Sequence, residues 1–208
     1  GFFVDGVDPE FRSALEAAVG VLTEAGMVRT SVELPMIEQA QTAHSVLVLA
    51  ESYSVHEDLY RARSEQYGPS ARQRVALGST VPASAYLQAA RVRKVFQDEF
   101  RKAMDGTDVL VTLTSPAPPP RFGEQPAHQF GARHMAKAGN RFTRMANLLG
   151  APAVSIPCGF TSSGLPIGLQ IIGRPGEDTT VLTVANAYQQ RTSWHTQAPP
   201  AAETTTVG

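Results

Sequence analysis

Few side chains in this sequence are grouped in a way that could attack a substrate. A nucleophilic centre needs a hydroxyl or thiol beside a base. The two candidates are Cys158 with His195, and the run Thr-Ser-Ser-Gly at 161–164. Cys158 continues an apolar run, which is typical of a small buried hydrophobic residue. The run 161–164 separates two β-prone segments, where a turn needs Ser and Gly for backbone reasons. We therefore expect neither grouping to be catalytic.

The sequence also contains no pattern typical of a metal site or a nucleotide-binding site. The five histidines form no H-x-H, H-x-x-x-H or Cys-paired spacing, which are the patterns that favour a metal centre. No glycine-rich phosphate loop occurs either. The sequence therefore predicts no metal site and no cofactor. The histidines are His44, His56, His128, His134 and His195.

The composition is that of an ordinary globular protein, with 42% hydrophobic and 18% charged residues among 208. A net charge of −1 argues against a nucleic-acid partner. The basic cluster over 91–102 is interrupted by acids, which indicates a solvated helix face. The single cysteine, Cys158, rules out a disulfide within the chain and fits a cytoplasmic location. No apolar run is long enough to span a membrane.

Hydrophobic periodicity predicts alternating helices and strands. Asp8 and Pro9 indicate a helix start, and the helix should end at Gly26. Further helices are expected at 36–67, 70–77, 82–104 and 131–149, and another from 177. Strands are expected at 28–34 and 108–113. Glu51 and Arg93 fall on apolar helix faces, so each needs a partner if buried. A Pro-rich surface loop should occupy 115–126.

The stretch from Asn147 to Gly173 is the centre of the predicted fold. Two apolar runs flank a short turn, so strands at 153–157 and 166–172 should pair as an antiparallel hairpin in the sheet interior. Together with 28–34 and 108–113 they give an α/β fold, a central mixed β-sheet flanked by α-helices on both faces. We expect one domain over 1–200 and a flexible tail at 201–208.

The same stretch carries a specific resemblance. The order N-L-x-G-x-P-A-x-S-I-P-C-G, a turn, and G-L-P-I-G-L-Q-I-I-G resembles the C-terminal hallmark of the amidase signature family. This resemblance implies an amide hydrolase with a Ser-Ser-Lys triad on a Gly/Ser-rich core. The chain matches only the second half of that fold and lacks the catalytic half. It begins at Gly1 without a methionine, so we expect a portion of a longer amidase.

The resemblance also implies two substrate-binding residues. Family members with carboxylate-bearing substrates are similar to this chain at Arg74, in ARQRVALG, and a planar guanidinium suits a carboxylate. Near Asn140 the glutamine-transferring subunit of the tRNA amidotransferase has an Asp. An amino-acid ammonium would lose its counter-charge at Asn140, which disfavours an amidotransferase function.

Two hypotheses for the whole protein remain open. In the first, this chain is the sheet core and pocket wall of an amidase, and its partners are the missing N-terminal half and a small amide substrate. In the second, it is a stand-alone binding module of the same fold. Under both, the isolated chain should hydrolyse no amide. An uncovered sheet edge and apolar face should then drive formation of a homodimer.

Overall fold

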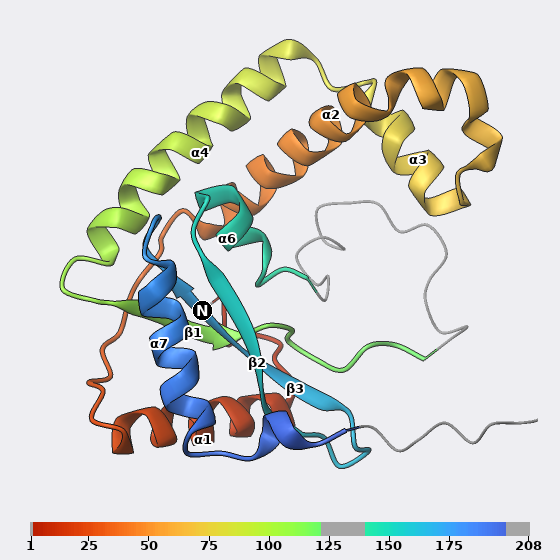
Figure 1. The fold of residues 1–208 in the computed structure, drawn as a ribbon. Coiled ribbons are helices and arrows are strands. Elements are labelled where there is room, and N and C mark those ends of the chain that lie inside the picture. Colours follow the sequence, from red (N-terminus) through yellow and green to blue (C-terminus); the bar gives the residue numbers. More distant parts are fainter. Residues whose placement is uncertain (1, 122–139, 199–208) are drawn as a thin grey trace, which may run out of the picture.

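A computed structural model describes residues 2–121 and 140–198 of the chain. Three strands form its sheet in the order β1-β3-β2 (Figure 1). They are β1 (Val109–Leu113), β2 (Ala153–Phe160) and β3 (Pro166–Gly173). Both pairings are antiparallel, so the described strands contain no parallel pair of the kind a mixed sheet has. The α/β class itself is confirmed.

The β2–β3 hairpin lies where the sequence predicts it. β3 is the central strand, and Leu169, Ile171 and Ile172 on it are fully buried. Gly164 closes the connecting turn with φ of +81°, a conformation that favours glycine. The ladder shifts register between Pro157 and Gly159, and a proline without an N–H suits an irregular edge strand. The predicted antiparallel hairpin is therefore confirmed, with β3 in the sheet interior and β2 at an edge of the described sheet.

One face of the sheet packs against α1 (Pro9–Glu24) and α7 (Asp178–Gln189) (Figure 1). The Asp8 carboxylate accepts the Glu10 N–H at 2.8 Å, which confirms the predicted N-cap. Leu169 and Ile171 belong to the apolar cluster on this face, together with Phe11, Val181 and other residues of the two helices. Side chains alternate along a strand, so the next residue, Ile172, points to the opposite face.

The second apolar cluster contains Ile172 and joins α2 (Ile37–Arg63), α4 (Ala83–Ala103) and α6 (Arg144–Leu149). Helices therefore cover both faces of the sheet. On the inner side of α4, Arg93 Nε donates to the Leu148 carbonyl at 2.7 Å and Gln97 Nε2 to that of Leu149 at 3.1 Å. These bonds satisfy carbonyl groups at the end of α6. They also confirm the expected partner for Arg93.

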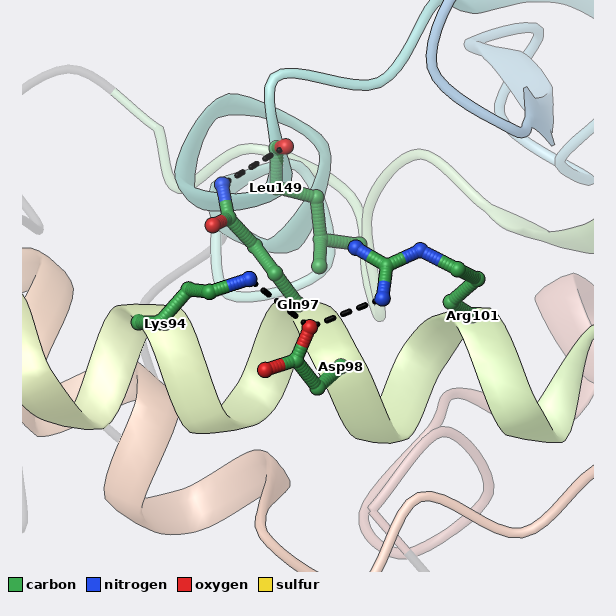
Figure 2. A network of polar contacts seen from close by, with 5 residues as sticks. All are labelled: Lys94, Gln97, Asp98, Arg101 and Leu149. Atoms are coloured by element: carbon green, nitrogen blue, oxygen red, sulfur yellow. Dashed lines mark hydrogen bonds and ion pairs between the residues drawn. The ribbon is translucent and has the colours of Figure 1, made fainter.

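The outer side of α4 is polar, as the sequence predicts for the basic cluster. Lys94 and Arg101 both form ion pairs with Asp98, at 2.9 and 2.8 Å, while Gln97 points toward α6 (Figure 2). All three charged side chains are solvated, so the network contributes little to stability. Glu51 accepts a hydrogen bond from the Tyr86 hydroxyl at 3.3 Å and thus also has a partner.

The N-terminal residues close the gap between the two apolar clusters. Phe2 and Phe3 pack against both clusters. Their rings lie 5.9 and 5.4 Å from the ring of Phe142. The guanidinium of Arg141 lies over the rings of Phe142 and Phe2, at 4.7 and 5.5 Å. This aromatic group fixes residues 140–142 just before α6.

Several predicted elements differ from the structure. Residues 28–34 form no strand, and the side chain of Val28 is 87% exposed. An alternating pattern forms a strand only beside a partner, and the described sheet offers none there. The helix predicted at 36–67 ends at Arg63 and is followed by η1 (Ser64–Gln66). Parts of the segments at 115–126 and 131–149, and the tail at 201–208, lie outside the described residues. No helix in the described ranges is long and apolar enough to cross a membrane.

Candidate functional site

Arg74 is held by a close contact between two helices. It lies on α3 (Pro69–Gly78), which packs against α2. Gly78 makes this contact possible, because a Cβ at that position would overlap the Leu49 carbonyl oxygen and lie 2.7 Å from Tyr53 Cβ. The Arg74 side chain itself is exposed, and within the described ranges no hydrogen bond or ion pair engages it. Its guanidinium is therefore available to a ligand.

Asn140 reaches the same region through Arg144, the first residue of α6. Arg144 Nη2 donates to Asn140 Oδ1 at 2.9 Å. Arg144 is only 7% exposed, and burial followed by the nearby charge of Arg74 lowers its pKa. Arg144 thus bonds to Asn140 and lies within the electrostatic influence of Arg74, so both predicted residues are related to the same side chain. Arg144 is the residue that connects them, and the sequence analysis did not identify it.

His44 on α2 completes this cationic cluster, which consists of Arg74, Arg144, Asn140 and His44. Burial first, then Arg144, then Arg74 lower the pKa of His44 to about 4. The imidazole is therefore neutral near pH 7. The charges of Arg144 and Arg74 disfavour a positive charge on His44, and the same charges favour a bound anion. The electrostatics of this cluster suit a carboxylate or a similar anionic group.

The segment that carries Asn140 and Arg144 is bonded to the sheet through Gln170. Gln170 on β3 is 3% exposed, and its Nε2 donates to Thr112 Oγ1 at 3.0 Å and to the Phe142 carbonyl at 3.2 Å. Phe142 lies between Asn140 and Arg144, so this bond fixes the segment that carries both. No sequence pattern predicts this contact, because Gln170 and Phe142 are joined only by the fold.

A hydroxyl pair lies further along the same sheet face. Thr114 Oγ1 and Ser155 Oγ are 2.6 Å apart across Gly168. A Cβ on Gly168 would lie 2.7 Å from the first oxygen and 2.9 Å from the second, so glycine is required for this close approach. The opposite face of the sheet is apolar. Polar side chains therefore gather at one end of one sheet face.

The two candidate nucleophilic groupings lie in a buried strand and in a hydrogen-bonded turn. Cys158 is 3% exposed, and burial raises the pKa of its thiol to about 12, whereas His195 is exposed on η2 (Trp194–Thr196). A buried thiol with a raised pKa is unreactive. In the 161–164 turn, Thr161 Oγ1 accepts the Leu165 N–H at 3.0 Å. The burial of Cys158 and the turn at 161–164 agree with the sequence analysis, and the absence of a catalytic role for either grouping stays a prediction.

The other histidines add no chemistry to the cationic cluster. His56 lies on α2 with its Nδ1 3.0 Å from the Tyr67 hydroxyl. His128 and His134 lie outside the described residues. Across residues 2–121 and 140–198, no group of three or more His, Cys, Asp and Glu residues could hold a metal ion.

Comparison with known proteins identifies the family to which the chain belongs. A family model described as Amidase matches residues 1–182. The chain therefore belongs to the amidase signature family.

The chain is 36% identical to an amidase from Pseudomonas putida over 201 residues, covering 95% of this chain and 43% of that protein. It is 35% identical to the A subunit of glutamyl-tRNA(Gln) amidotransferase from Halorhodospira halophila, covering 95% of this chain and 45% of the relative. The chain thus spans less than half the length of the curated relatives that it matches.

Solved structures show the same partial coverage. A crystal structure of an amidase superimposes with a TM-score of 0.80 at 26% identity, covering 91% of this chain and 44% of the other. The A subunit of glutamyl-tRNA(Gln) amidotransferase from Thermotoga maritima gives a TM-score of 0.70 at 26% identity, with 92% and 41% covered. The architecture in Figure 1 therefore corresponds to one part of a larger fold.

Proposed function

We propose that this chain is the C-terminal portion of an amidase signature hydrolase that cleaves the C–N bond of a carboxylic amide. The Ser-Ser-Lys triad of such an enzyme lies outside the chain, in the missing N-terminal half. The present residues supply sheet core and one wall of the substrate pocket. The observation that carries this proposal is the cationic cluster, whose Asn140–Arg144 segment is bonded to the sheet through Gln170, in a chain that belongs to the family.

Arg74 and Asn140 are the proposed substrate-binding residues. The exposed guanidinium of Arg74 can bind a substrate carboxylate through two parallel hydrogen bonds. Asn140 offers a neutral amide, and its oxygen already accepts a hydrogen bond from Arg144. A substrate ammonium placed there would face guanidinium groups. The proposed substrate is therefore a small amide that carries a carboxylate and no ammonium.

Binding of two small amides to the 208-residue chain tests this assignment. Succinamate carries a carboxylate, and glutamine adds an ammonium to a similar skeleton. We expect succinamate to bind more tightly than glutamine, and Arg74→Gln to weaken succinamate by about tenfold, the effect of losing one charge-assisted contact. Arg72→Gln, which removes an exposed charge from the same helix, is the matched control. Equal losses in both variants would refute a specific role for Arg74.

Asn140→Asp provides the complementary test. A carboxylate at 140 restores a counter-charge for an ammonium, so the preference should shift from succinamate toward glutamine. An unchanged ratio of the two affinities would remove Asn140 from the pocket.

Two alternatives rest on specific observations. Relatives named as the A subunit of glutamyl-tRNA(Gln) amidotransferase match the chain over 95% of its length, which supports an amidotransferase-like parent. The composition of the cationic cluster supports a stand-alone binding module, because its four side chains offer contacts for an anion and include no hydroxyl or thiol. The parent reading frame distinguishes these from an amidase. An upstream Gly/Ser-rich loop with a Lys favours an enzyme, and its absence favours the binding module.

We also propose that the isolated chain forms a homodimer. β1 and β2 are the two edges of the described sheet, and an edge presents unpaired N–H and C=O groups. In the longer protein the N-terminal half would pair with such an edge. A second copy can substitute for it, with an association that persists at high salt because apolar burial drives it. Sedimentation as a monomer at tens of micromolar would refute this.

The domain boundaries and the cellular location of the protein are also proposed here. We propose that residues 1–200 form one domain. The two apolar clusters support this, because Ile171 of β3 belongs to one cluster and the next residue, Ile172, belongs to the other. The single cysteine supports a cytoplasmic location. Unfolding in two separate steps would argue for two units, and a single cooperative transition for one.

A further inference from the structure

A concave surface lies where α2 ends and the chain passes through η1 toward α3. The connection through η1 reverses the chain, and the two helices pack side by side at the end of the molecule remote from the sheet (Figure 1). An open cavity of about 400 Å³ lies at this connection, against the C-terminal part of α2 and η1. It is lined by His56, Leu59, Arg63, Gln66, Tyr67 and Gly68. Arg74 is not among the lining residues.

The walls of this cavity, here called the hairpin cavity, are mainly apolar and are held in place by ring contacts. The Tyr67 ring meets the His56 ring edge-on at 5.8 Å and the Tyr60 ring at 5.9 Å. The Tyr67 hydroxyl also lies 3.0 Å from His56 Nδ1. Leu59 adds an aliphatic side chain that is 49% exposed. Such walls suit the face of a small ring.

One guanidinium lines the hairpin cavity. It belongs to Arg63, and no Asp, Glu or Lys lies among the lining residues. In the described part of the chain Arg63 has no ion pair or hydrogen-bond acceptor. Arg61, two residues earlier, is by contrast paired with Glu57 at 2.5 Å. The hairpin cavity therefore combines an apolar body with one available guanidinium.

We propose that the hairpin cavity binds a small aryl carboxylate. The carboxylate would pair with the Arg63 guanidinium, whose planar fork matches two carboxylate oxygens. The ring would lie against Leu59 and Tyr67. Small-molecule sites are typically concave, mainly apolar and oriented by a few polar groups, with volumes of roughly 300–1,000 Å³. This ligand is held by different residues from the amide substrate proposed above, so the two binding events are separate.

Benzoate is the probe, added to the 208-residue chain while the imidazole signals of the histidines are followed by NMR. We expect a saturable shift of the His56 signal with a Kd on the order of millimolar, as suits a ligand of this size. Benzyl alcohol has a similar shape and no charge, so it should bind about tenfold more weakly. Arg63→Gln should cause a similar tenfold loss for benzoate, and Leu59→Asn a smaller one.

Arg61→Gln is the matched control, because it removes a neighbouring charge that does not line the hairpin cavity. We expect it to leave benzoate affinity unchanged. Equal losses in Arg61→Gln and Arg63→Gln, equal binding of benzyl alcohol, or no saturable His56 shift would each overturn the proposal. Arg74→Gln should not alter the His56 response. If succinamate fails to bind while benzoate still shifts His56, only the substrate-pocket proposal fails.

Discussion

Gly78→Ala tests whether the packing of α3 on α2 is as tight as the structure indicates. The added methyl would overlap the Leu49 carbonyl oxygen and lie 2.7 Å from Tyr53 Cβ. Both atoms belong to or adjoin the α2 backbone, so α3 has to move. Overpacking costs about 1–3 kcal/mol, and Ala recovers less than about 1 kcal/mol of helix propensity at this helix end. We expect a net destabilisation of about 1–2 kcal/mol.

In a chain of 208 residues this loss corresponds to a Tm lower by about 2–8 °C. Thermal unfolding followed by circular dichroism measures it. Gly20→Ala is the matched control, because Gly20 lies within α1, is exposed and has no atom within 4 Å of an added Cβ. Ala should stabilise there by about 0.4–1 kcal/mol. If both variants raise Tm, the close contact between α3 and α2 is wrong.

Three further predictions concern buried and half-buried groups. The pKa of His44, lowered to about 4 by burial and then by two guanidiniums, lies below the unfolded value of 6.5. The unfolded chain therefore binds more protons between these values, and stability falls as pH drops from 6.5 to 4. In urea titrations His44→Gln should reduce that slope, and parallel slopes would contradict the shift. The Cys158 thiol, with its pKa raised to about 12, should react with a thiol reagent at about pH 8 only after unfolding, so rapid labelling of the folded chain would refute its burial. Gln170→Leu removes the donor to Thr112 and the Phe142 carbonyl, and urea unfolding should show a loss of about 1–3 kcal/mol, whereas an unchanged midpoint would contradict these bonds.

Local sequence signals predicted the elements that local interactions specify. The Asp8 cap and the hairpin turn depend on residues within a few positions of one another, and both are confirmed. The expected strand at 28–34 failed for the opposite reason. Its alternating pattern is satisfied only by a neighbouring strand, and the exposed Val28 shows that the described chain provides none. A pattern predicts the capacity for a strand, while a partner decides whether it forms.

The cationic cluster was only partly predictable. The family resemblance points to Arg74 and Asn140, and no pattern in the sequence identifies Arg144 or His44 as their neighbours. These residues are brought together by α2, α3 and α6, elements separated by long stretches of chain. Arg144 gave one usable signal, because a charged residue directly before the apolar run of α6 needs a partner. The identity of that partner, Asn140, required the structure.

The arrangement β1-β3-β2 also determines the order in which contacts can form during folding. β2 and β3 are joined by a short turn, so their pairing closes only a small loop. β1 reaches β3 across the whole segment from Thr114 to Leu165, and closing that larger loop costs more chain entropy. The hairpin should therefore be formed in the folding transition state before β1 docks. Weakening the turn at Gly164 should slow folding, while truncating Val111 on β1 should mainly accelerate unfolding.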